Sequence, residues 1–216
     1  MKVIGVTGNV GAGKSTFCGL LSKKGYKILN ADNISKQFLL SDTPERQQVL
    51  QYFGTSCRNK TGNGLDFKKL AEIVFNNSKD LKYLNSILHP AVKRRVAKLL
   101  QDECQKDPQS VVFYESSLIY EVGKYDMIQK VAVVCAEDEV RMSRVKENRG
   151  WSQKEMNKRE GFQLPQNYKV KLADYVIDNS QWVSQLECVL PNFIDWVESL
   201  PDLTQESFQE CIIAAN

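Results

Sequence analysis

The sequence predicts an α/β protein whose parallel β-sheet carries helices on both faces. Five short apolar runs, each bounded by turn residues, alternate with helix-compatible sequence, which is typical of parallel strands joined by crossover helices. The first run leads directly into a glycine-rich motif and then into a helix-compatible segment. The runs occupy residues 2–6, 26–29, 110–114, 130–134 and 174–177.

The motif at residues 7–16, TGNVGAGKST, has the spacing of a phosphate-binding loop, or P-loop. Its glycines allow successive backbone N–H groups to point into one concavity, where they can cradle a di- or triphosphate, and the following helix adds partial positive charge. Lys14 supplies a full charge to the β and γ phosphates, and the Ser15 hydroxyl suits Mg²⁺. We therefore expect a protein with a P-loop NTPase-type sheet that uses ATP and Mg²⁺. The residues expected to bind ATP are Gly8, Gly11, Ala12, Gly13, Lys14, Ser15 and Thr16.

Composition and charge narrow the class of protein further. A chain of 216 residues with 42% hydrophobic and 25% charged residues suits one globular domain with an insertion. The net charge of +3 is too weak to indicate a nucleic-acid partner, and no apolar run reaches the roughly 18 residues needed to cross a membrane. Six cysteines without paired spacing and a single histidine argue against a disulfide framework or a zinc site. We expect a cytoplasmic monomer or weak homo-oligomer with no nucleic-acid or membrane partner.

The stretch between the second and third predicted strands, residues 41–107, has no strand signal. Asp66 is predicted to cap a helix, and Pro90 to interrupt or kink one. An insertion at strand ends is a natural substrate-recognition subdomain, and a long crossover is the alternative. Helices are predicted at residues 45–52, 67–75 and 81–105, with a glycine- and asparagine-rich loop at 53–64.

Residues 137–169 are predicted to form a basic helical hairpin, with helices at 137–147 and 153–162. Basic charge on helices usually marks a solvated face, but near a triphosphate site it suits a lid that closes, excludes water and places arginines on the transferring phosphate.

The remaining domain and helix boundaries follow from these assignments. One domain is predicted at residues 1–200, with its core at 1–40, 108–136 and 170–199, a helix from 181 to about 199 capped by 178–180, and a tail at 200–216.

Acidic residues follow the second and third predicted strands. Ligands of a parallel sheet bind at the carboxyl ends of its strands, so these residues are candidates for chemistry. Asp32 is a candidate base that takes a proton from a substrate hydroxyl, or else the cap of a helix at residues 34–40. Glu115 either holds Mg²⁺ through water or is a structural acid paired with a cation of the lid.

Phosphoryl transfer to a small molecule is the chemistry that these residues favour. A GTPase switch should have an Asp-x-x-Gly element and an Asn-Lys-x-Asp element, and the sequence has neither. A small-molecule kinase instead needs a carboxylate near the γ phosphate. A nucleoside or nucleoside monophosphate kinase and a non-catalytic P-loop switch are the alternatives.

A series of short motifs follows the P-loop in a specific order. They are Asn30-Ala-Asp32, Phe53-Gly54, Gly64-Leu-Asp66, Leu84-Asn85, Ile87-Leu-His-Pro90, Leu118-Ile-Tyr-Glu121, Gln163 with Pro165 and Lys169, and Ala173-Asp174 with Ile177-Asp-Asn179. In the order and spacing of these motifs, residues 1–179 resemble the dephospho-CoA kinase family. The resemblance implies ATP-dependent phosphorylation of the ribose 3′-hydroxyl of dephospho-CoA, the final step of CoA synthesis, with a helical insertion that binds the CoA moiety.

The resemblance also implies roles for single residues. It makes Asp32 the base and His89 a substrate contact, although a histidine before a proline in a helix is otherwise more often structural. Lys14 and an arginine of the lid would stabilise the moving phosphoryl group, and the family's lid arginine matches Arg144 first and Arg149 second.

The chain departs from the family pattern at three places. Glu115 and Ser117 stand where the family has aspartate and proline. Phe67 stands where the family usually has arginine, and residues 148–150 read Asn-Arg-Gly instead of Arg-Asp-Gly.

Overall fold

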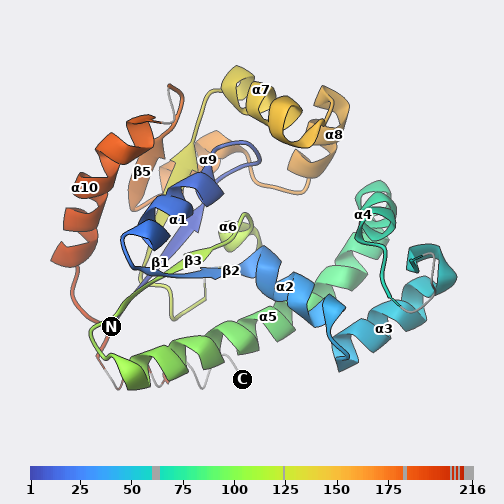
Figure 1. The fold of residues 1–216 in the computed structure, drawn as a ribbon, viewed down its shortest axis with the longest axis horizontal. Helices are drawn as coiled ribbons and strands as arrows, with labels where there is room; N and C mark the ends of the chain where they lie inside the picture. The colour runs from blue at the N-terminus through green and yellow to red at the C-terminus, as the bar shows by residue number, and fades with distance from the viewer. Residues whose placement is uncertain are drawn as a thin grey trace. The chain divides into compact units, whose positions relative to one another are not determined.

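The computed structural model describes residues 1–59, 64–123, 125–181, 184–204, 206, 208, 210 and 211. The chain divides into two compact units, one made of residues 1–30 and 97–216 and the other of residues 31–96. The first unit contains the sheet and the P-loop, and the second is helical. Figure 1 shows the ribbon coloured along the chain.

The first unit is built on a five-stranded parallel sheet, which confirms the predicted fold class. The strand order is β2-β3-β1-β4-β5, so β1, which leads into the P-loop, lies at the centre. It pairs in parallel with β3 on one side and β4 on the other. The strands are β1 (Lys2–Thr7), β2 (Lys27–Asn30), β3 (Val111–Glu115), β4 (Lys130–Cys135) and β5 (Tyr175–Asp178), each within one residue of its predicted position.

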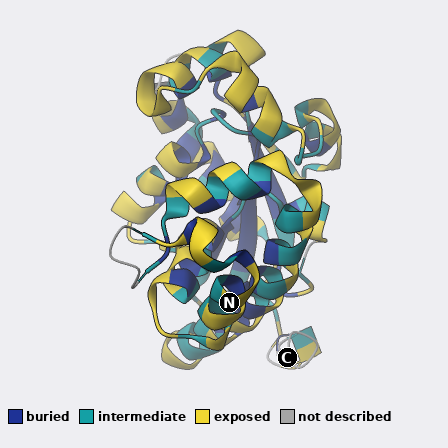
Figure 2. Cartoon of the chain, turned by 90° about the vertical axis from the view of Figure 1, so that its right-hand side faces the viewer, coloured by how far each residue is buried: buried dark blue, intermediate teal, exposed yellow. Residues whose placement is uncertain are grey.

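Two helices, α1 (Lys14–Lys23) and α10 (Ser184–Ser199), pack their apolar faces on the strands and form one buried cluster with them (Figure 1). The strands at the centre of Figure 2 are coloured mostly as buried. The rings of Phe17 on α1 and Phe193 on α10 meet edge to face, with centroids 5.1 Å apart. This packing fixes the helix that begins at the P-loop. The first unit also contains α6 (Ile119–Val122), α7 (Asp138–Arg149), α8 (Gln153–Glu160), α9 (Gln166–Leu172) and the end of α5 (Ser78–Lys106).

The second unit has its own apolar core, formed by the helices α2 (Ala31–Leu40), α3 (Pro44–Phe53), α4 (Phe67–Asn76) and the first part of α5, with the 3-10 helix η1 (Gly54–Cys57). Asp66 caps α4 as predicted, because its carboxylate accepts the backbone N–H groups of Lys68 and Lys69 at 3.0 and 3.1 Å. Residues 60–63 of the predicted loop lie outside the described residues.

Pro90 does not interrupt the helix, since α5 is continuous over 29 residues, and a kink there stays a prediction. Proline removes one hydrogen bond of the helical ladder. Here Pro90 is exposed, while Leu88 and Val92 on either side are buried. Tertiary packing therefore holds the helix through a residue that disfavours it locally.

Other helix boundaries also differ from the predictions; α5, for example, begins at Ser78 instead of residue 81. Helix α2 begins at Ala31 instead of residue 34, and α10 is described over Ser184–Ser199, with residues 182 and 183 of the predicted helix outside the described residues. Helix α9 follows Pro165, in a stretch where no helix was predicted. Pro165 directly precedes α9, and proline suits the start of a helix because its φ is fixed near helical values.

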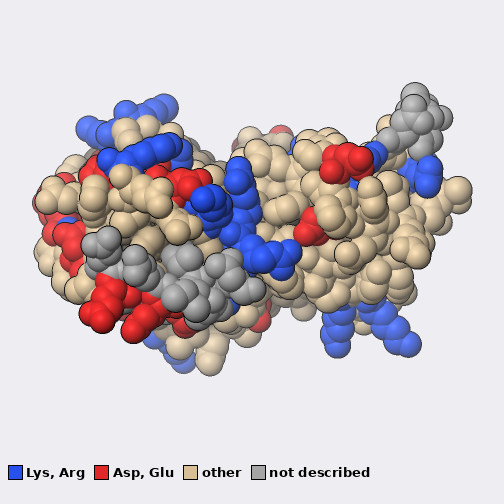
Figure 3. Space-filling view, turned by 90° about the horizontal axis from the view of Figure 1, so that it is seen from below, with Lys and Arg blue, Asp and Glu red and all other residues tan. Residues whose placement is uncertain are grey.

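The surface carries charges of both signs, as the face drawn in Figure 3 shows. Among the described residues, no helix is long and apolar enough to cross a membrane. Of the predicted tail at 200–216, residues 205, 207, 209 and 212–216 lie outside the described residues, and Phe208 is buried.

We predict that Phe193→Ala lowers the free energy of unfolding by about 3–5 kcal/mol, because a fully buried ring between α1 and the sheet would leave a cavity. Chemical denaturation monitored by circular dichroism measures the change. Tyr168→Ala is the matched control, since its ring is 50% exposed, and it should stay within about 0.5 kcal/mol of the wild type. Equal losses in both variants would contradict this account of the core.

Candidate active site

The P-loop connects the central strand to α1 and is held in a shape that only glycine allows. Gly13 has φ 98° and is the residue that precedes α1. A Cβ atom there would lie 2.2 Å from Nδ2 of Asn179, which donates a hydrogen bond to the Ala12 carbonyl at 2.8 Å. The first turn of α1 contains no acidic residue. Its backbone N–H groups and helix dipole can therefore attract an anion.

Lys14 is buried at the start of α1, and its ammonium group bends back onto the loop. Nζ donates hydrogen bonds to the Gly8 carbonyl at 2.7 Å and to the Asn9 carbonyl at 3.3 Å. The positive charge therefore lies inside the loop, where it can reach phosphates bound by the same backbone.

Glu115 ends β3 as a buried carboxylate beside the P-loop. It accepts hydrogen bonds from the Ser15 hydroxyl and the Asn30 amide, both at 2.7 Å. Burial raises the pKa of the Cys18 thiol, and the Glu115 charge raises it further, so this thiol stays neutral. The two donors to Glu115 named above, Ser15 and Asn30, are neutral side chains. Both predicted roles of Glu115, a magnesium ligand through water and a partner of a lid cation, stay predictions.

The segment after β4 contacts the tip of the P-loop at several points. Arg141 on α7 donates to the Val10 carbonyl at 2.9 Å, and the Gln163 side chain accepts the Val10 N–H at 3.3 Å. The Asn9 side chain donates to the Leu164 carbonyl at 3.2 Å. Both sides of the loop tip are therefore anchored in the predicted lid.

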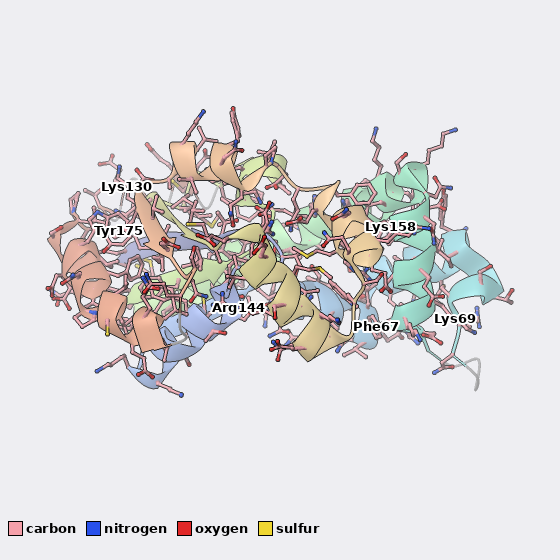
Figure 4. The ribbon with its side chains drawn as sticks, turned by 90° about the horizontal axis from the view of Figure 1, so that it is seen from above. Phe67, Lys69, Lys130, Arg144, Lys158 and Tyr175 are labelled. Carbon is pink, nitrogen blue, oxygen red and sulfur yellow. The ribbon has the colours of Figure 1, made fainter. Side chains whose placement is uncertain are left out.

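The predicted lid arginines make other contacts. Arg144 on α7, labelled in Figure 4, donates to the Gln181 carbonyl at 3.1 Å. Arg149 lies over the Trp151 ring at 4.8 Å from its centroid, and Arg159 lies over the same ring at 3.7 Å. The catalytic roles of Arg144 and Arg149 stay predictions.

Asp32 and His89 both belong to the second unit. Asp32 is exposed in the first turn of α2, two residues beyond Asn30 in the chain. The alternative in which it caps a helix at residues 34–40 is wrong, because α2 already begins at Ala31. His89 is half-buried on α5, and burial lowers the pKa of its imidazole. The roles of Asp32 and His89 as base and substrate contact stay predictions.

Sequence reasoning assigned no role to Arg141 or Lys169, although both are buried. Lys169 pairs with Glu121 at 2.7 Å and donates to the Ser117 carbonyl at 2.8 Å, while Glu121 also accepts the Leu164 N–H at 2.7 Å. Burial lowers the pKa of Lys169, and the Glu121 carboxylate opposes that shift. The pair fixes the segment that contacts the loop tip. Lys169 and Glu121 both belong to the family-like motifs, and this was the sequence signal that could have identified the pair.

We predict that Gly11→Ala raises the Kd for ATP by about tenfold or more. Gly11 has φ 78°, and an added Cβ would lie 2.6 Å from the Arg141 carbonyl oxygen, so the loop must shift. Gly19→Ala on α1 is the matched control, because nothing lies within 4 Å of its Cβ position. Isothermal titration with ATP measures both. Wild-type affinity in a folded Gly11→Ala protein would show that this packing does not shape the phosphate site.

The sequence matches known proteins over most of its length. A family model described as dephospho-CoA kinase matches residues 2–185. The dephospho-CoA kinase of Aquifex aeolicus is 37% identical over 180 residues, covering 83% of this chain and 89% of the relative. That of Carboxydothermus hydrogenoformans is 34% identical, covering 83% and 86%.

Solved structures agree with the sequence matches. A crystal structure of a Thermus thermophilus protein aligns with a TM-score of 0.74 and 31% identity, covering 93% of this chain and 98% of the other. The dephospho-CoA kinase from Campylobacter jejuni aligns with a TM-score of 0.64 and 28% identity, covering 91% and 98%. With a P-loop at the centre of the sheet and a family match over residues 2–185, the chain belongs to the dephospho-CoA kinase family.

Proposed function

We propose that the protein transfers the γ-phosphoryl group of ATP to the ribose 3′-hydroxyl of dephospho-CoA and so produces CoA and ADP. The observation that carries the proposal is a buried P-loop lysine next to a Ser15–Glu115 pair, in a chain of this family. One bond forms between the ribose oxygen and the γ phosphorus, and the bond from that phosphorus to the β–γ bridging oxygen breaks.

The P-loop would hold the phosphates through its backbone N–H groups and Lys14. The carbonyl oxygens of Gly8 and Asn9 that Lys14 now contacts are neutral acceptors. Phosphate oxygens are charged acceptors and form stronger hydrogen bonds with an ammonium group. Lys14 would therefore turn toward the β and γ phosphates as ATP binds.

Ser15 and Glu115 fit a magnesium ion. Hydroxyl and carboxylate oxygens are the hard ligands that Mg²⁺ prefers, and those of Ser15 and Glu115 lie 2.7 Å apart. When bound, Mg²⁺ supplies positive charge to the β and γ oxygens. Asn30 keeps the Glu115 carboxylate oriented toward this position through a hydrogen bond at 2.7 Å.

Asp32 would take the proton of the 3′-hydroxyl, and His89 would contact the CoA moiety. Asp32 is an exposed carboxylate shortly after β2, where a parallel sheet presents its ligands. Lys14 and an arginine from Arg144 or Arg149 would stabilise the charge on the transferred group, a role that is worth about 10³-fold or more for arginine fingers.

We predict that ATP with Mg²⁺ phosphorylates dephospho-CoA, with a product of the mass of CoA, and that AMP, CMP and uridine are not phosphorylated. Mass spectrometry of the products measures this directly. Preferential turnover of AMP, CMP or uridine would instead assign a nucleoside or nucleotide kinase. ATP binding without transfer to any acceptor would leave the P-loop switch as the function.

We predict that Asp32→Asn lowers kcat by about 10²- to 10⁴-fold and leaves the Kd for ATP unchanged, because only proton transfer is lost. Steady-state kinetics and ATP titration measure the two effects. Asp42→Asn is the matched control, since Asp42 is a 78% exposed carboxylate of the second unit, and it should keep wild-type turnover. Wild-type kcat in Asp32→Asn would remove this residue from the base role.

A further inference from the structure

Arg141 is a buried cation that links the P-loop to two helices. Its side chain is 4% exposed, and α7 carries it over the loop between β1 and α1 (Figure 1). The guanidinium donates to the Val10 carbonyl at 2.9 Å and to the Asp138 carboxylate at 2.7 Å, and it pairs with Glu160 on α8. Burial opposes its charge, but the hydrogen bonds to Glu160 and Asp138 outweigh this cost and raise the pKa of Arg141.

The contact with Val10 acts on a peptide group of the phosphate cradle. The Val10 carbonyl and the Gly11 N–H belong to the same peptide unit. A cation hydrogen-bonded to the carbonyl polarises the unit, so its N–H becomes a stronger donor to an anion. Gly11 also packs against the Arg141 backbone, where an added Cβ would lie 2.6 Å from the carbonyl oxygen.

The preceding peptide unit is held as well. The Val10 N–H is bonded to the Gln163 side chain at 3.3 Å, so both peptide units that flank Val10 are anchored by the segment after β4. Arg141 differs from Gln163 because it brings a full charge, and because Glu160 connects it to α8. The orientation of the loop tip thus depends on how the guanidinium is held.

We propose that Arg141 is a positioning residue for ATP, an inference that rests on the proposed function of the P-loop as the ATP site. Through Val10 it orients and polarises the Gly11 peptide unit, while Asp138 and Glu160 hold the planar guanidinium in place. It acts through the loop and needs no contact with the transferred phosphoryl group. Arg144 and Arg149 contact Gln181 and Trp151 instead.

The test measures ATP and acceptor binding separately in Arg141 variants. Arg141→Met should raise the Kd and KM for ATP by about tenfold, the range expected when a charged hydrogen bond is lost, and leave the KM for dephospho-CoA within about twofold. Arg141→Lys keeps the charge but loses the planar fork. It should recover most of the ATP affinity, to within about threefold of the wild type.

Two further variants control for charge and for folding. Lys146→Met removes an exposed cation from the same helix and should leave ATP affinity unchanged. Glu160→Gln keeps Arg141 but weakens its hold, so it should raise the ATP Kd by about threefold and add little in the double variant with Arg141→Met. If Arg141→Met does not fold, the ATP Kd of Glu160→Gln tests the proposal in its place.

The result that overturns the proposal is an ATP Kd within twofold of the wild type in folded Arg141→Met, or in Glu160→Gln if the methionine variant fails to fold. Parallel losses of ATP and dephospho-CoA affinity, with no recovery in Arg141→Lys, would indicate a merely structural residue and also overturn it. Because ATP titration needs no acceptor, a wrong acceptor in the proposed function leaves this test intact. Failure of wild-type protein to bind ATP would refute both.

Discussion

The P-loop keeps its shape because other segments of the first unit close around it, and the site depends on this constraint. Helix α7 packs on Gly11, the Asn179 amide holds the Ala12 carbonyl at 2.8 Å, and Gln163 holds the Val10 N–H at 3.3 Å. A loop that is already ordered loses little conformational entropy when it binds a ligand. The N–H groups can therefore favour a phosphate without first paying to organise the backbone.

These contacts meet at one place because of the strand order. With β1 at the centre of a parallel sheet, the carboxyl ends of β3 and β4 lie on either side of the P-loop. Glu115 ends β3 and is hydrogen-bonded to Asn30 at the end of β2. On the other side, Arg141 comes from the helix after β4, and Asn179 follows β5. The acid of the candidate metal site and the anchors of the loop thus come from opposite sides of one central strand.

Local signals in the sequence were sufficient for the strands, the P-loop and the Asp66 cap, because each depends on neighbouring residues. The signals failed where distant packing decides. Helix α5 continues through Pro90 because apolar side chains on both sides are buried. Arg141 could not be distinguished by sequence from Arg144, since the two share a face of α7 and only the fold decides which of them is buried against Val10.

In the proposed function, the free energy of ATP binding would depend on the hydrogen bonds that Lys14 exchanges. A buried ammonium group without partners would be very costly, so the loop itself satisfies it through the Gly8 and Asn9 carbonyls. In the proposed function, a bound triphosphate would replace these neutral acceptors with anionic ones, whose hydrogen bonds to a cation are roughly twice as strong. Before a phosphate binds, the hydrogen bonds from Lys14 to the Gly8 and Asn9 carbonyls keep the loop compact. In the proposed function, the same lysine would thus stabilise the fold of the loop before binding and make phosphate binding more favourable.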